Sequence, residues 1–181
     1  HQTMPKKAYL YGLPMELYEK HGIRKYGFHG TSHGYVARQA AKLMKLPFEE
    51  LKIITCHLGN GGSITAFDRG KSVDTSMGLT PLEGIIMGTR CGDLDPAIVL
   101  YLQEMLGLSL ADTNDLLNKK SGLKGLCGKA DMRDIVTLSN QGDEKAQTAI
   151  DVFCYRIQKY IGAYIGVLNG VNAIVFTAGI G

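Results

Sequence analysis

A strand, a glycine-rich turn and a second strand follow one another over residues 51–67, and this unit constrains the fold more than any other. Leu51–Cys56 is an apolar run rich in β-branched residues, which predicts a strand, and Ile64–Phe67 predicts a second one. His57–Ser63 (HLGNGGS) lies between them and predicts the turn of an antiparallel hairpin. Asp68–Lys71 (DRGK) predicts a further turn, so the chain is expected to contain a sheet.

Helical patterns surround this hairpin. The longest covers 144–168, where apolar side chains recur at the helical period, and Asn169-Gly170 ends it before a buried strand over 173–176. Residues 72–95 are rich in glycine and polar side chains and predict an ordered, functional loop. Shorter helices are expected over 15–21, from Thr31 to just before Pro47, over 96–106, from Ser109 to a stop at Gly122, and over 132–138.

Composition excludes several classes of protein. The 181 residues suit one domain or slightly more, and 20 Lys and Arg against 17 Asp and Glu leave a net charge of +3. That charge is too small and too evenly spread for a nucleic-acid binder. The sequence contains no apolar run of about 18 residues, so no membrane-spanning helix is predicted. The four cysteines form no C-x-x-C pair, and their loose spacing predicts free thiols in a cytoplasmic protein.

The 57–63 turn is the strongest candidate for a binding site. Gly59, Gly61 and Gly62 let the main chain approach a ligand, and their N–H groups can form a nest for phosphate oxygens. Asn60 and Ser63 add side-chain donors. The alternative is a plain hairpin turn, because Asn-Gly is also a strong hairpin signal. A plain turn does not need three glycines and a preceding His57, so the ligand site is favoured.

The segment 26–33 (YGFHGTSH) is a second candidate. A helix that begins at Thr31 or Ser32 would direct its unpaired N–H groups outward beside His29, which favours an anion. A capping role is one alternative. Zinc is another, since His29 and His33 are four residues apart, but no Glu completes an H-E-x-x-H pattern.

Two further clusters carry charge. Arg90 lies between glycines in a loop that ends at a helix N-terminus, where a guanidinium suits a carboxylate or phosphate. A surface Arg paired with Asp93 or Asp95 is the alternative. Residues 129–134 (KADMRD), by themselves, indicate a helix cap with a charge pair.

Together these clusters identify a resemblance. The sequence resembles the acetate kinase family, within the superfamily that includes sugar kinases, heat-shock proteins and actin. The resemblance covers essentially the whole chain, and the 53–70 stretch is long enough to be highly specific. The matching stretches are HQTMP (1–5), YGFHGTSH (26–33), IITCHLGNGGSITAFDRG (53–70), GTRCGDLDPAI (88–98), DMRD (131–134) and FTAGIG (176–181).

The resemblance implies a fold and an activity. It implies a ribonuclease-H-like α/β domain, with a mixed sheet, flanking helices and a helical insertion over 95–142. It implies reversible, Mg²⁺-dependent transfer of the γ-phosphoryl group of ATP to acetate, giving acetyl phosphate and ADP, in a cytoplasmic homodimer. Propionate kinases share nearly all of these motifs and are the alternative.

Roles for individual residues also come from the resemblance. His29 and Arg90 match the catalytic residues that stabilise the phosphoryl group. The residues that match nucleotide contacts are His57, Leu58, Gly59, Asn60 and Gly61 of the hairpin, Asp131, Met132 and Arg133 at the adenosine, and Gly179, Ile180 and Gly181 under the nucleotide.

The chain is expected to be a fragment of a longer protein. Position 1 is not Met, and residues 175–181 form a strand that leads into a glycine turn, which normally precedes a helix. The family's catalytic Asp would lie before His1 and its magnesium-associated Glu beyond Gly181, so no metal ligand is expected here. The 181 residues would be most of the second, nucleotide-binding domain and inactive alone. A nucleotide-binding module without chemistry, or a zinc hydrolase using His29, His33 and His57, are the other interpretations.

Overall fold

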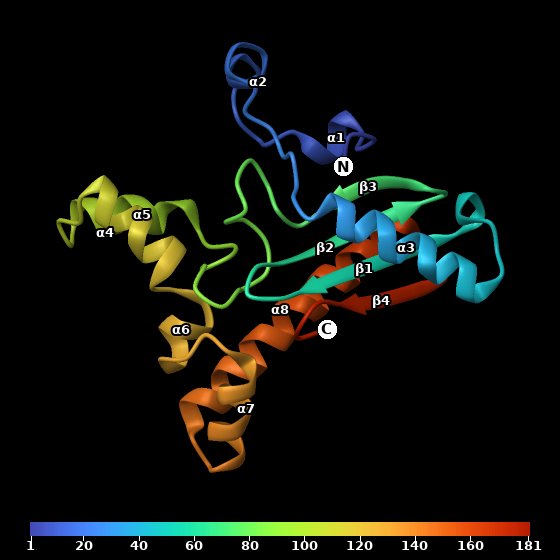
Figure 1. Ribbon diagram of the computed structural model, residues 1–181. Helices are drawn as coiled ribbons and strands as arrows, with labels where there is room; N and C mark the ends of the chain where they lie inside the picture. The colour runs from blue at the N-terminus through green and yellow to red at the C-terminus, as the bar shows by residue number, and fades with distance from the viewer.

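The computed structural model describes residues 1–181 and contains one four-stranded mixed sheet (Figure 1). Its order is β3-β2-β1-β4. Strand β1 pairs antiparallel with β2 and parallel with β4, with Ile53 opposite Ala173 and His57 opposite Thr177. The strands are β1 (Lys52–Leu58), β2 (Gly62–Asp68), β3 (Lys71–Thr75) and β4 (Ala173–Thr177).

Helices cover both faces of the sheet. Since successive side chains of a strand point to opposite faces, alternate residues of each strand contact different helices. On one face, Ala37 and Ala41 of α3 (Gly30–Met44) pack with Ile53 and Phe67. On the other face, α8 (Glu144–Leu168) packs with the alternate residues of β1 and β2, among them Ile54 and Ile64. The continuous apolar runs at 53–56 and 64–67 are the consequence of burial on both faces.

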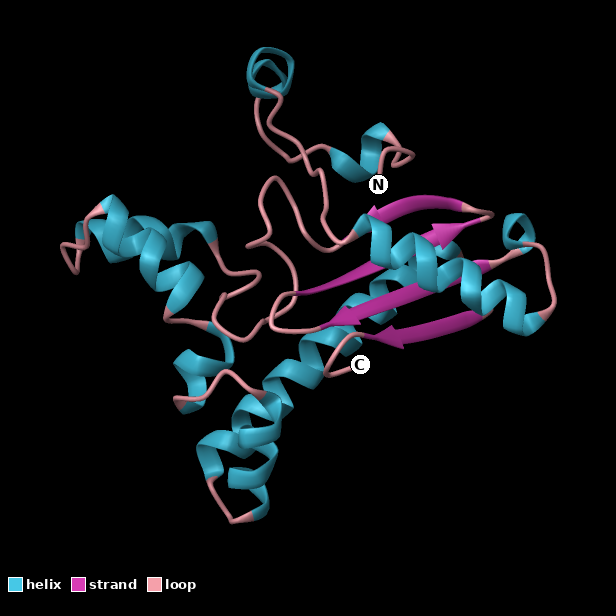
Figure 2. Cartoon of the chain, in the orientation of Figure 1, coloured by secondary structure: helices cyan, strands magenta, loops and turns pink.

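The remaining helices lie outside these layers. The helices α4 to α7 connect β3 to α8 and extend away from the end of the sheet (Figures 1 and 2). Helices α6 and α7 pack against α8. The bounds are α1 (Lys6–Tyr9), α2 (Met15–His21), the short 3-10 helix η1 (Phe48–Glu50), α4 (Pro96–Glu104), α5 (Leu110–Lys119), α6 (Gly122–Cys127) and α7 (Met132–Asn140).

Helix starts follow the expected capping chemistry. Side chains of Asp95, Ser109, Asp131 and Asp143 each accept a hydrogen bond from a backbone N–H of the first turn of α4, α5, α7 and α8, respectively. Such a bond satisfies one of the unpaired donors of a helix N-terminus. The predicted bounds of α2 and α8 are confirmed.

Several predicted boundaries are wrong. His57 and Leu58 continue β1, and Gly62 already belongs to β2, so the turn itself is only 59–61. The ladder extends this far because Leu58 pairs with Gly62 across it. Residues 72–75, expected in the long loop, form part of β3 on the edge of the sheet.

Three further predictions need correction. Gly122 does not end a helix but begins α6, with a left-handed φ of 63°. Helix α3 starts at Gly30 rather than at Thr31 or Ser32, because His29 takes the capping position with φ 59°. Strand β4 is not buried: it is an edge strand, and the Phe176 side chain is 53% exposed.

The prediction of free cysteines is confirmed, since none of the four forms a disulfide. No helix is both long and apolar enough to cross a membrane.

Candidate functional site

The predicted site segments meet at one edge of the sheet, where the parallel strands β1 and β4 end side by side. The turn 59–61 follows β1 and the turn 178–181 follows β4, and the backbone N–H of Ile180 donates to the Leu58 carbonyl at 2.8 Å. The carboxyl ends of parallel strands are the usual position of ligands in α/β proteins. The sheet topology therefore joins two segments that are far apart in the sequence.

A cleft of about 540 Å³ opens between these turns and the start of α7. Its volume is in the range of small-molecule sites. Three of the predicted segments contribute to it: the hairpin turn, the cap of α7 and the turn after β4. The cleft is lined by Gly59, Asn60, Ala130, Asp131, Met132, Arg133, Gly179 and Ile180.

Four of the predicted nucleotide residues, His57, Leu58, Gly61 and Gly181, do not line the cleft. The Leu58 side chain is 5% exposed and belongs to the core beneath α8. Gly181 folds back on Thr177, leaving no room for a Cβ. Ala130 also lines the cleft, although it was not predicted from the sequence. An alanine contributes only its backbone and a methyl group, so its residue type does not indicate a binding role.

The cap of α7 carries the charge of the cleft. Asp131 accepts from the backbone N–H of Arg133 at 2.9 Å, and Arg133 Nη2 lies 2.6 Å from Asp131 Oδ2. The hydrogen bonds from the Arg133 side chain and backbone lower the pKa of Asp131 to about 2. The Arg133 side chain is 89% exposed, so its guanidinium can turn toward a ligand in the cleft.

His29 and Arg90 meet beside the hairpin turn. A Cβ at Gly61 would lie 3.2 Å from Arg90 Nη1 and 3.8 Å from His29 Nε2, so this glycine leaves a gap that both side chains face. Arg90 makes no ion pair within the protein, and its side chain donates hydrogen bonds only to the Pro81 carbonyl and the Met87 sulfur. The alternative of a surface Arg paired with Asp93 or Asp95 is therefore wrong.

The Arg90 loop is attached directly to the turn. The backbone N–H of Gly88 donates to the Asn60 carbonyl at 3.1 Å, and the Asn60 side chain occupies the space where a Cβ of Gly88 would lie. Asn60 also lines the cleft. The gap between His29 and Arg90 and the cleft are thus neighbouring parts of one surface, joined by a single turn.

The histidines form a compact cluster behind this surface. His29 and His57 stack with ring centroids 4.2 Å apart, and Ser32 Oγ lies 2.9 Å from His57 Nδ1. Burial, followed by the nearby His57 and Arg90, lowers the pKa of His29, and burial also lowers that of His57. Burial, reinforced by the two other imidazoles, lowers the pKa of His33 to about 3. All three rings are therefore neutral near pH 7.

This cluster does not resemble a metal site. Both ring nitrogens of His33 are engaged, Nδ1 by Thr55 and Nε2 by Ser63, so this ring has no free lone pair for zinc. No group of three or more His, Cys, Asp or Glu side chains is arranged so that it could hold a metal ion. The residues present do not form a Mg²⁺ cage either.

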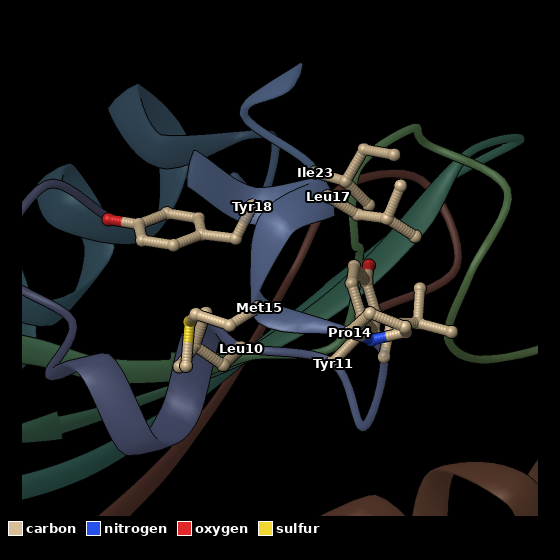
Figure 3. Close-up of a pocket in the computed structure, with 8 residues that line it drawn as sticks. Leu10, Tyr11, Pro14, Met15, Leu17, Tyr18 and Ile23 are labelled. Carbon is tan, nitrogen blue, oxygen red and sulfur yellow. The ribbon is translucent and has the colours of Figure 1, made fainter. Parts of the chain in front are cut away.

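A small cavity lies at α2 and the segments that flank it, and Figure 3 shows the residues that line it. It has a volume of only about 10 Å³ and is walled almost entirely by apolar side chains such as Leu10, Leu17 and Ile23. This is at most the space of one water molecule. It is a packing void and not a ligand site.

The mixed sheet between two helical layers, with glycine turns at the ends of its parallel strands, defines a ribonuclease-H-like α/β protein of the actin-like ATPase type. The model of the acetokinase family matches residues 1–181. The chain belongs to the acetate kinase family, which confirms the resemblance seen in the sequence.

Individual relatives agree with this assignment. The chain is 62% identical over 181 residues to the acetate kinase of Carboxydothermus hydrogenoformans, covering 100% of this chain and 46% of that protein. A crystal structure of Porphyromonas gingivalis acetate kinase superposes with a TM-score of 0.97 at 47% identity, covering 99% of this chain and 45% of that one. A propionate kinase structure from Francisella tularensis gives 0.96 at 51% identity, covering 100% and 47%. The chain spans about half the length of the curated relatives it matches.

Proposed function

We propose that this chain forms the nucleotide-binding part of a cytoplasmic acetate kinase, which transfers the γ-phosphoryl group of ATP reversibly to acetate, giving acetyl phosphate and ADP. Residues 1–181 correspond in this proposal to most of the family's second domain, with 95–142 as a helical insertion. The supporting observation is the juxtaposition of the 540 Å³ cleft with the gap between His29 and Arg90.

The geometry suits a nucleotide laid across both parts of the surface. The adenosine occupies the cleft against Met132 and Ile180, which supply apolar contact, and the phosphates extend over Gly59–Gly61 toward the gap. Backbone N–H groups of a glycine turn bind phosphate oxygens because no side chain blocks the approach. The γ-phosphoryl group then lies between His29 and Arg90.

Two donors of different charge act on the transferred group. Phosphoryl transfer spreads negative charge over the equatorial oxygens, so catalysis depends on positioned donors more than on covalent chemistry. Arg90 supplies a permanent charge in a fork suited to phosphate. His29, whose pKa is lowered by burial and by its neighbours, supplies a neutral N–H donor. The Mg²⁺ that the family uses neutralises phosphate charge when bound with ATP.

The nucleotide part of this proposal is tested by isothermal titration calorimetry of the chain with Mg-ATP. One variant combines Asn60→Ala in the turn with His57→Ala near the end of β1. The control is Gly12→Ala, at an exposed position with open space around it. Binding is expected to be lost in the first and kept in the second. A folded wild-type chain that binds no Mg-ATP would refute the proposal that these residues alone form a nucleotide site.

The acceptor is tested separately, in the enzyme that carries these residues, by trapping acyl phosphate with hydroxylamine. Acetate and propionate are supplied at equal concentrations, since the similarity to the Francisella tularensis propionate kinase makes propionate the second candidate. A higher kcat/KM with acetate supports the proposal, and a higher value with propionate assigns the chain to a propionate kinase. A homodimer is expected and is measured by analytical ultracentrifugation.

A further inference from the structure

A line of buried polar side chains connects the interior of the sheet to His29. Thr55 Oγ1 lies 2.7 Å from His33 Nδ1, His33 Nε2 lies 2.7 Å from Ser63 Oγ, and Ser63 Oγ lies 2.8 Å from His29 Nδ1. The first three residues have no exposed surface. Each hydrogen bond in this line must therefore be satisfied within it.

The direction of the first bond follows from Thr55. Its hydroxyl has one hydrogen and no other hydrogen-bond partner, and a buried hydrogen without an acceptor is unfavourable. Thr55 therefore donates to His33 Nδ1. Because a neutral imidazole carries one hydrogen, His33 has it on Nε2 and donates to Ser63 Oγ. The pKa of His33, lowered to about 3 by burial, agrees with a neutral ring.

The direction of the last bond follows in the same way. Ser63 accepts from His33, and its own hydrogen has no acceptor other than His29 Nδ1. His29 Nδ1 therefore carries no hydrogen, and the neutral ring must carry it on Nε2. This is the nitrogen that faces the gap beside Gly61 and Arg90.

We propose that Thr55, His33 and Ser63 are positioning residues that hold His29 as the Nε2–H tautomer, so that a neutral imidazole donates to an anionic oxygen in the gap. With the opposite tautomer, the lone pair of Nε2 would face that oxygen and repel it. The identity of the oxygen, a phosphoryl oxygen of ATP, rests on the proposed function. The tautomer itself belongs to the chain without ligand.

The tautomer is measured directly by ¹⁵N NMR of the chain labelled with ¹⁵N-histidine, near pH 8 and without nucleotide. Protonated and bare ring nitrogens of neutral histidine have well separated shifts, and a His29→Asn variant assigns the signals. The expected result is hydrogen on Nε2 and a bare Nδ1. Hydrogen on Nδ1 in the wild-type chain would overturn the proposal.

Variants test the line itself. Ser63→Ala removes the donor to Nδ1 and is expected to give His29 a mixture of both tautomers. Ser32→Ala is the matched control, because Ser32 contacts His57 instead, and it should leave His29 unchanged. If Ser63→Ala fails to fold, Thr55→Val removes the first donor with almost no change of shape. A His29 tautomer that neither variant alters would also overturn the proposal.

A kinetic readout separates positioning from a purely structural role. In the enzyme that carries these residues, Ser63→Ala is expected to lower kcat by about tenfold or more, with little change in KM for ATP. Ser63→Thr, which keeps the hydroxyl, is expected to restore most of kcat. A Mg-ATP titration of the NMR sample distinguishes the two proposals. If His29 is the Nε2–H tautomer but the chain does not bind Mg-ATP, only the proposed nucleotide site is refuted. If the chain binds Mg-ATP but His29 is the Nδ1–H tautomer, only the positioning role of Thr55, His33 and Ser63 is refuted.

Discussion

Replacing Gly61 by alanine should weaken phosphoryl binding without harming the fold. The added methyl group would lie 3.2 Å from Arg90 Nη1 and 3.7 Å from His29 Cε1, in the gap that both side chains face. A phosphate oxygen bound to a guanidinium needs a distance of about 2.7–2.9 Å from the nitrogen, so the methyl group and the oxygen compete for one position.

The size of the effect follows from the bond that is lost. A hydrogen bond to a charged group contributes about 1.5–3 kcal/mol, which corresponds to about a 10- to 150-fold weaker affinity for Mg-ATP. The backbone at Gly61 has no left-handed φ, so alanine fits it without strain. Restricting the unfolded chain stabilises such variants by about 0.4–1 kcal/mol, so the melting temperature should stay level or rise slightly.

The assay is calorimetric titration with ATP and with AMP, each with Mg²⁺. In the proposed placement AMP would fill the cleft without reaching the gap, so its affinity should be unchanged while that of ATP falls. The neighbouring Gly62→Ala is the matched control. Its Cβ would lie 2.8 Å from Ile85 Cδ1 in the core, which should cost about 1–3 kcal/mol of stability and leave ATP binding intact. Equal losses for ATP and AMP in Gly61→Ala, or no loss for either, would refute this placement of the phosphates.

Three further outcomes are expected. Phe153→Ala, which empties a buried position in the core cluster around α8, should lower the free energy of unfolding in urea by about 3–5 kcal/mol, and a loss below about 1 kcal/mol would contradict this packing. Asp143→Ala should cost about 0.5–2 kcal/mol by thermal melting, since it removes the cap of α8, whereas Asp143→Asn should keep most of it. Stability should fall as the pH drops from about 6.5 toward about 3, because His33 takes up a proton in the unfolded chain but stays neutral when it is buried in the folded one. In His33→Gln, the urea midpoint should depend less on pH over this range.

Several elements were predictable because their signals are local. The 144–168 helix follows from its apolar period and its cap at Asp143, and its bounds are confirmed to the residue. The hairpin follows from two apolar runs separated by glycines. The exact turn did not, because the ladder runs on through His57 and Leu58, and strand ends depend on pairing that a single segment does not reveal. The strand over 173–176 was predicted, but its exposure was not, since an apolar run does not show whether a strand lies at the edge of its sheet.

The site divides in the same way. Residue types alone indicated which positions could bind a phosphate, namely the glycines of the turn, His29 and Arg90, since backbone freedom and side-chain charge are properties of single residues. The packing of distant segments placed Ala130 and Asp131 with Asn60 in one cleft. It also placed Ser63 between His33 and His29, although Ser63 and His29 are 34 residues apart. The Ser63 contact requires that β2 pairs with β1, which places Ser63 opposite His57, and that α3, which carries His33, packs on the sheet. Contacts between segments that are distant in the sequence depend on how the segments pack, and the residue pattern of either segment alone does not predict them.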